Sequence, residues 1–226
     1  MAKINGRSPA TRLELGAAVL AAAHALDTRP IKDRLARFER AHHTYATAYA
    51  KVETAEEQLR AAQVRVAERD VDQDKAVEAV TRALVADGRD RFNPFAVFGL
   101  PSPGAIVRLP IADEMATIGR LVSAIQQDKM ASKATLQAAQ AVDKAARAVE
   151  QALAPIDKPT AAVREARQMR DATTQGWEIA YAALRRDAQA ATAEGAAGLY
   201  PALFGATARP AAKASKPAPV PAPVAS

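Results

Sequence analysis

The chain has 226 residues and a formal net charge of +6, and alanine makes up about a quarter of it. Aromatic residues are only 4%, so the interior holds many small side chains and few large ones, which favours close-packed helices over a β-sandwich or barrel. Cysteine is absent, which excludes disulfides, thiolate catalysis and zinc–cysteine sites.

The excess of positive charge lies at the two ends of the sequence. Lys3, Arg7 and Arg12 have no acidic residue among them over residues 1–12, and residues 207–226 likewise hold basic residues and no acid. The body between these ends is neutral, whereas a nucleic-acid-binding fold carries a basic face. We therefore expect no nucleic-acid partner, and a nucleic-acid organiser that works through its basic ends is the least favoured of three functional hypotheses.

Residues 1–25 have two interpretations. Basic residues precede an apolar run from Leu15 to Ala23, and Ala23-His24-Ala25 fits a small-x-small cleavage site. This is the outline of a secretory signal peptide, which would make the protein secreted or periplasmic.

The other interpretation of the N-terminus is a flexible basic segment at 1–10 and an amphipathic helix over about 11–26. In that helix Leu13 and Leu20 would face a partner. Glu14 adjoins an apolar run that is short and mostly alanine, which is unlike a signal peptide. We therefore expect a cytoplasmic protein, with secretion as the alternative.

A stretch without glycine or proline over residues 31–87 predicts a long helix. Its apolar and aromatic residues alternate at spacings of four and three, which is the heptad seam of helices that wrap around each other. The pattern fades over residues 69–74, where a solvated turn of helix, a stutter and a bend all remain open. The seam residues of the first half are Ile31, Leu35, Phe38, His42, Tyr45, Tyr49 and Val52.

Residues 89–110 form a loop with four prolines and two glycines, which exclude a long regular element. We call it the aromatic loop, because Phe92, Phe95 and Phe98 lie within it. It is too apolar for a freely solvated connection. We expect it either to fold back and cap the end of the bundle, or to be exposed and anchor the protein to something else.

The heptad spacing returns in the second half of the chain. It predicts a helix over 111–154, a turn between Pro155 and Pro159, and another helix over 160–194. The sequence thus predicts an all-α fold: a single elongated domain over 11–206, built from long antiparallel helical hairpins or a coiled-coil-like bundle. Residues 207–226 are mainly Ala, Pro, Lys, Ser and Val, and are expected to be a disordered tail.

An apparent calcium-binding motif is incomplete. Asp70, Asp72 and Asp74 have the spacing that opens an EF-hand loop. However, Lys75 stands where the sharp turn needs glycine, and Thr81 where a bidentate glutamate belongs. We expect no calcium site here.

Other catalytic and cofactor patterns are incomplete or missing. Glu39 and His42 form one Glu-x-x-His pair, whereas a di-iron bundle needs two, and the other histidines have no such glutamate. The sequence has neither a Gly-rich phosphate loop nor a serine nucleophile elbow. We expect no metal, no cofactor and no enzymatic activity.

The leading hypothesis is a non-enzymatic structural or scaffolding protein that acts through helix–helix association, by self-association or with a protein partner. The alternative is a peripheral surface-binding protein, anchored to a lipid, a polymer granule or a partner groove by residues 92–109. In composition alone the chain resembles bacterial proteins that coat polymer granules. The candidate interaction residues, from the aromatic loop and a weak echo of it near residue 200, are Phe92, Phe95, Phe98, Leu100, Tyr200 and Phe204.

Overall fold

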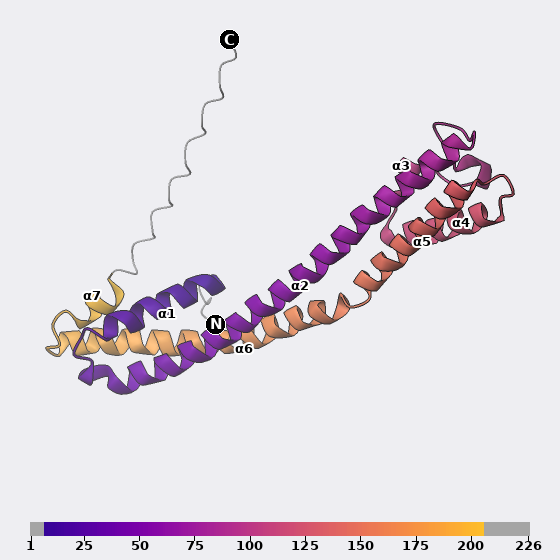
Figure 1. The fold of residues 1–226 in the computed structure, drawn as a ribbon. Helices are drawn as coiled ribbons and strands as arrows, with labels where there is room; N and C mark the ends of the chain where they lie inside the picture. The colour runs from indigo at the N-terminus through magenta and orange to yellow at the C-terminus, as the bar shows by residue number, and fades with distance from the viewer. Residues whose placement is uncertain (1–6, 206–226) are drawn as a thin grey trace, which may run out of the picture. The chain divides into compact units, whose positions relative to one another are not determined.

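The computed structural model describes residues 7–205, and all regular structure in that range is helical. This confirms the all-α class and the long helices, while the predicted tail at 207–226 lies outside the described residues. Short 3-10 turns cover Arg29–Ile31 and Ala96–Phe98. The α-helices are α1 (Pro9–Ala23), α2 (Lys32–Ala86), α3 (Pro103–Ile106), α4 (Ile111–Gln127), α5 (Lys133–Leu153), α6 (Asp157–Ala193) and α7 (Leu199–Phe204) (Figure 1).

The chain divides into two compact units. Among the described residues, unit 1 comprises 7–50 and 168–205, and unit 2 comprises 51–167. Helices α2 and α6 each contribute residues to both units. No helix of the described part is both long enough and apolar enough to cross a membrane.

Helix α1 is part of the core of unit 1. It begins at Pro9, because Ser8 is its N-cap and the Ser8 hydroxyl accepts a hydrogen bond from the backbone N–H of Thr11 at 3.2 Å. The helix therefore includes two residues that the sequence assigned to a flexible segment. Its buried positions repeat at spacings of four and three, like the seam predicted for α2, and are Arg12, Gly16, Val19 and Ala23.

Aromatic rings fill the centre of unit 1. Trp177 of α6 is fully buried and stacks on Tyr181 with a centroid distance of 4.9 Å. Phe38 of α2 meets Trp177 edge-on at 5.6 Å, and Tyr45 lies one heptad further along the same helix. Of the predicted seam of α2, Ile31, Phe38 and Tyr45 are buried in this unit and Val52 is buried in unit 2. The other seam residues, Leu35, His42 and Tyr49, are half-buried.

Helix α2 is continuous through residues 69–74, where the seam fades. The reason is a change of partner: Gln73 is fully buried in unit 2 against the N-terminal turn of α4. The bend left open by the sequence is therefore not observed: the stretch is helical, and Gln73 within it is buried rather than solvated.

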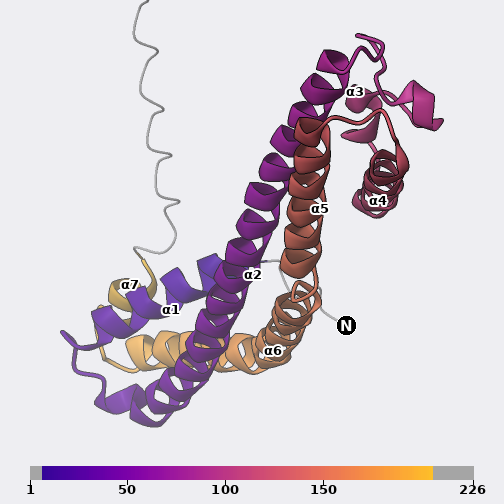
Figure 2. The ribbon, with the colours of Figure 1, turned by 45° about the vertical axis from the view of Figure 1, so that its right-hand side comes forward.

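The core of unit 2 combines the end of α2, the aromatic loop, α4 and α5. Its fully buried members include Leu84, Phe95, Ile106, Ile118 and Val142. Helices α4 and α5 pack along each other beside α2 (Figure 2). A smaller apolar cluster in the same unit is formed by Val52 and Ala55 of α2 with Val163 and Ala166 of α6.

The helix predicted over 111–154 is divided in two. Asp128 ends α4 in an extended conformation, and its Oδ1 accepts the backbone N–H of Met130 at 2.9 Å. Ser132 then caps α5, accepting the N–H of Thr135 at 3.2 Å. The break lacks glycine and proline, but Asp and Ser favour turns and caps through such side-chain hydrogen bonds.

Candidate interaction surface

The aromatic loop both caps the core of unit 2 and exposes apolar side chains. Phe95 has no exposed surface and Leu100 is also buried, while Phe98 is partly buried against the same core. Phe92, by contrast, lies outside this core and is 89% exposed. Burial and exposure therefore occur at different residues of one loop.

A hydrogen-bonded turn holds Phe92 in place. Oδ1 of Asp90 accepts the backbone N–H groups of both Phe92 and Asn93, each at 2.7 Å. These hydrogen bonds lower the pKa of Asp90 below its ordinary value, and the bond from Asn93 has the largest effect. Gly99 follows with a φ of 66°, a left-handed conformation that favours glycine and returns the chain to the buried Leu100.

The loop between α4 and α5 lies at the same end of unit 2 as the aromatic loop (Figure 2). Arg89 forms an ion pair with Asp128, which joins the start of one loop to the start of the other. Asp87, at the end of α2, accepts hydrogen bonds from the Thr135 hydroxyl at 2.6 Å and the Ser132 N–H at 2.9 Å. These hydrogen bonds lower the pKa of Asp87; the bond from Thr135 has the largest effect, followed by those from Ser132.

We define the tip surface as five exposed side chains of these two loops: Arg91, Phe92, Val97, Lys129 and Met130. Met130 is 76% exposed and Val97 is 55% exposed. Within residues 7–205, neither Arg91 nor Lys129 forms an ion pair.

The remaining predicted candidates lie in unit 1 and are less exposed. Phe204 is buried and meets Tyr181 edge-on at 5.7 Å. Tyr200 is partly buried, and its hydroxyl accepts a hydrogen bond from Nε of Arg185 at 2.8 Å. Helix α7 is therefore a packed part of unit 1, and neither of its two candidate residues is exposed as Phe92 is.

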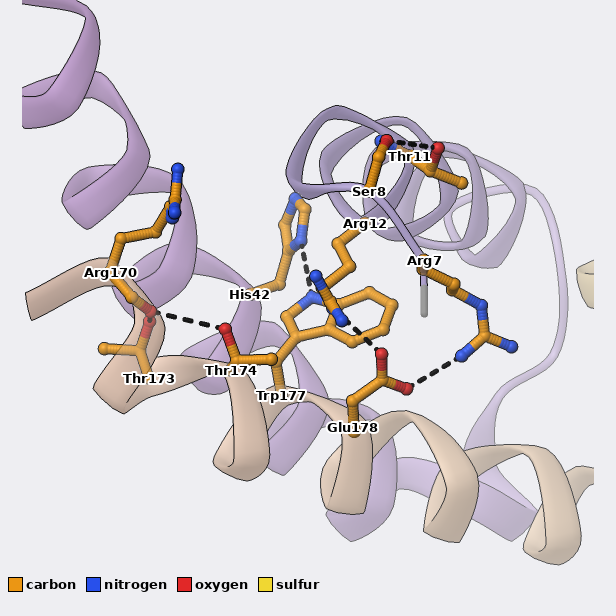
Figure 3. A network of polar contacts seen from close by, with 10 residues as sticks. All are labelled: Arg7, Ser8, Thr11, Arg12, His42, Arg170, Thr173, Thr174, Trp177 and Glu178. Atoms are coloured by element: carbon orange, nitrogen blue, oxygen red, sulfur yellow. Dashed lines mark hydrogen bonds and ion pairs between the residues drawn. The ribbon is translucent and has the colours of Figure 1, made fainter. Parts of the chain in front are cut away.

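A network of polar contacts that the sequence did not reveal lies beside Trp177 (Figure 3). Arg12 donates from Nε to Oε1 of Glu178 at 2.9 Å, and Arg7 donates from Nη1 to Oε2 at 2.7 Å. Burial lowers the pKa of Arg12, but its interactions with Glu178 and Tyr45 outweigh that effect and the pKa is raised. One carboxylate thus binds two arginines from the N-terminal part of the chain.

His42 belongs to the same network. The indole N–H of Trp177 donates to Nδ1 of His42 at 3.2 Å, so the imidazole is neutral and carries its proton on Nε2. Burial first, and then the charge of His43, lower the pKa of His42. Gly16 of α1 lies so close that an added Cβ would overlap this ring. The network therefore joins α1 to α2 and α6.

Unit 2 contains one further buried polar pair. Nε2 of Gln73 donates to Oε1 of Glu114 at 2.9 Å, and both residues are buried. Burial chiefly raises the pKa of Glu114; the charges of Asp70 and Asp74 raise it too, and the Gln73 bond opposes the change. The Oε1 atom of Gln73 has no hydrogen-bond partner.

The residues of the two incomplete metal-binding motifs do not form a metal site. Asp70, Asp72 and Asp74 lie along the continuous helix α2, and Nδ1 of His42 is occupied by Trp177. Within the described range, no group of three or more His, Cys, Asp or Glu side chains is arranged to hold a metal ion.

Comparison with protein-family models, curated proteins and solved structures found no match to this chain.

Proposed function

We propose that the chain is a non-enzymatic, peripheral surface-binding helical protein that attaches through the tip surface. The observation that carries this proposal is the contrast between Phe92, 89% exposed, and Phe95, fully buried three residues later. A loop needed only as a cap would keep both rings in the core, because exposing a phenylalanine forfeits hydrophobic stabilisation. The hydrogen bonds of Asp90 hold the exposed ring in a fixed turn.

The burial of the heptad seams supports an attachment role over association between copies. Phe38 and Tyr45 are fully buried in unit 1, and Ile118 and Ile125 are fully buried in unit 2. A second copy of the chain is not needed to remove these side chains from water. Among the large apolar side chains that stay exposed, Phe92 and Met130 of the tip surface are the most exposed, at 89% and 76%.

Retention on an octyl-substituted matrix tests the proposal, because the matrix presents an apolar surface without a specific ligand. The Phe92→Ser/Met130→Ser variant should elute much earlier than the wild type. Ile179→Ser is the matched control, since Ile179 is 62% exposed but lies on α6 in unit 1. Equal retention of the tip variant and the wild type would overturn the proposal.

Scaffolding by helix–helix association is the second candidate function. A stripe of small and apolar residues on α6 favours it, because the residues recur at spacings of three and four and are exposed: Met169, Ala172, Gly176 and Ile179. Light scattering across a size-exclusion column separates the candidates. Attachment through the tip predicts a particle of 23.9 kDa. A multiple of that mass, reduced to one by Met169→Ser/Ile179→Ser, would support the scaffold.

A further inference from the structure

We propose that the tip surface inserts into the interfacial region of an anionic lipid bilayer, with Phe92 and Met130 entering the headgroup boundary and Arg91 and Lys129 binding the lipid phosphates. This inference rests on the proposed function, because it names the surface to which the tip attaches.

The arrangement of the apolar side chains suits a fluid surface. Phe92 and Met130 belong to different loops, joined by the Arg89–Asp128 ion pair at the end of α2. Both side chains are mostly in solvent. Burial of a phenylalanine ring removes on the order of 150–250 Å² from water, and lipid can close around separate side chains without a complementary shape.

The charges of the two loops favour an anionic surface. Asp87, Asp90 and Asp128 are all engaged within the protein, by backbone N–H groups, hydroxyls or Arg89. Arg91 and Lys129 are exposed, next in sequence to Phe92 and Met130, and form no ion pair in the described range. Cations beside inserted apolar side chains are attracted to anionic headgroups, and each acts within a Debye length of the surface.

The turn that holds Phe92 lowers the entropic cost of insertion. Asp90 fixes the backbone on either side of the ring, and Asn93 accepts the N–H of Phe95 at 3.2 Å. The ring is therefore presented to a surface without ordering the loop first, which preserves affinity. A soluble polyanion would bind Arg91 and Lys129 but gives no role to the exposed Phe92.

Co-sedimentation of the full chain with sonicated vesicles tests this inference. Vesicles of phosphatidylcholine alone are compared with vesicles in which about three lipids in ten are phosphatidylglycerol, at low and at high salt. The wild type should bind the anionic vesicles at least tenfold more tightly, and lose most of that preference at high salt.

Two variants separate the apolar and the charged contributions. Phe92→Ser/Met130→Ser should lower binding to anionic vesicles at least tenfold. Arg91→Glu/Lys129→Glu should remove the preference for anionic over neutral vesicles. The matched controls, Ile179→Ser and Arg60→Glu/Arg65→Glu, alter exposed residues on helices away from the two loops and should bind like the wild type. Circular dichroism verifies that every variant keeps its helix content.

The outcomes also distinguish this inference from the function on which it rests. A wild type that ignores anionic vesicles, yet is held on the octyl matrix through Phe92 and Met130, overturns the lipid inference and leaves tip attachment standing. Failure on both surfaces overturns both. Vesicle binding that survives both tip variants assigns the lipid contact to another part of the chain and likewise overturns the inference.

Discussion

Arg12 and Glu178 are 166 positions apart in the sequence, and the Arg12 Nε–H donates to Oε1 of Glu178 at 2.9 Å. The pair is mostly buried, with 9% of the Arg12 side chain and 14% of the Glu178 side chain exposed. It joins the first helix to the long helix α6 on the border of the aromatic core. Unit 1 therefore depends on a specific polar contact for the placement of α1.

Removing one member of this pair should destabilise unit 1. Arg12→Ala leaves the carboxylate of Glu178 in a buried position with only Arg7 as partner, and we expect a loss of about 2–4 kcal/mol in the free energy of unfolding. Urea unfolding followed by the fluorescence of Trp177 measures this, because the only tryptophan lies in unit 1. Arg34→Ala, which breaks an exposed pair with Asp187 in the same unit, is the control and should cost less than about 0.5 kcal/mol. Equal effects would show that burial adds nothing to the Arg12 pair.

Two glycines of unit 1 should respond in opposite directions to alanine. Gly16→Ala places a methyl group against the ring of His42, and we expect a loss of about 1–3 kcal/mol from overpacking. Gly176→Ala adds a methyl group to an α6 position with nothing within 4 Å, and should stabilise by about 0.5–1 kcal/mol through helix propensity. The same urea experiment reports both variants. A stabilising Gly16→Ala would contradict the close approach of α1 and α2.

His42 should make unit 1 less stable in mild acid. Its pKa is lower in the folded protein than in the unfolded chain, so the unfolded state binds more protons as the pH falls through about 6.5. Protonation also puts an N–H on Nδ1, where the Trp177 indole already donates. Unfolding curves between pH 8 and pH 5 should show this loss, and His42→Gln, which keeps an acceptor and does not titrate, should flatten it. An unchanged pH profile in that variant would assign the effect to other groups.

Glu114 should have the opposite effect in unit 2. Its pKa is raised in the folded state, so its contribution to stability is present in acid and is lost as the pH rises through that pKa. At pH 7 Glu114→Gln should stabilise α4 by about 1 kcal/mol, because it removes a buried charge and supplies a donor for Oε1 of Gln73. Hydrogen exchange of residues 111–127 measures the gain. Asp113→Asn alters an exposed neighbour and should give no protection, so matching gains would argue against the buried pair.

The sequence predicts the contacts that depend on spacing along one helix. The seam residues Phe38, Tyr45 and Val52 are all buried as the heptad pattern indicates, and α2 has nearly the predicted limits. Contacts between polar residues on different helices could not be predicted in this way. From the sequence alone, Arg12 belongs to a basic end of the chain, whereas in the structure it forms an ion pair with Glu178. Gln73 interrupts the apolar pattern of the sequence, whereas in the structure it donates a hydrogen bond to Glu114.

The exposed residues could be predicted only as a group. Composition marks the aromatic loop as too apolar for a free connection, but the division between Phe92 and Phe95 depends on the turn made by Asp90. Met130 was not predicted as a candidate, because the break between α4 and α5 carries neither glycine nor proline. The sequence signal for this break was Asp128, at the end of α4, followed four residues later by Ser132, which caps α5.

Attachment through the tip surface is tested most directly by a fluorophore at single sites, because the chain has no cysteine of its own. Val97→Cys and Ile179→Cys each carry an environment-sensitive nitrobenzoxadiazole label, and emission is recorded with and without octyl-coated particles. We predict a blue shift and a rise in intensity for the label at residue 97, and little change for the label at residue 179. A shift at residue 179 with none at residue 97 would contradict attachment through the tip.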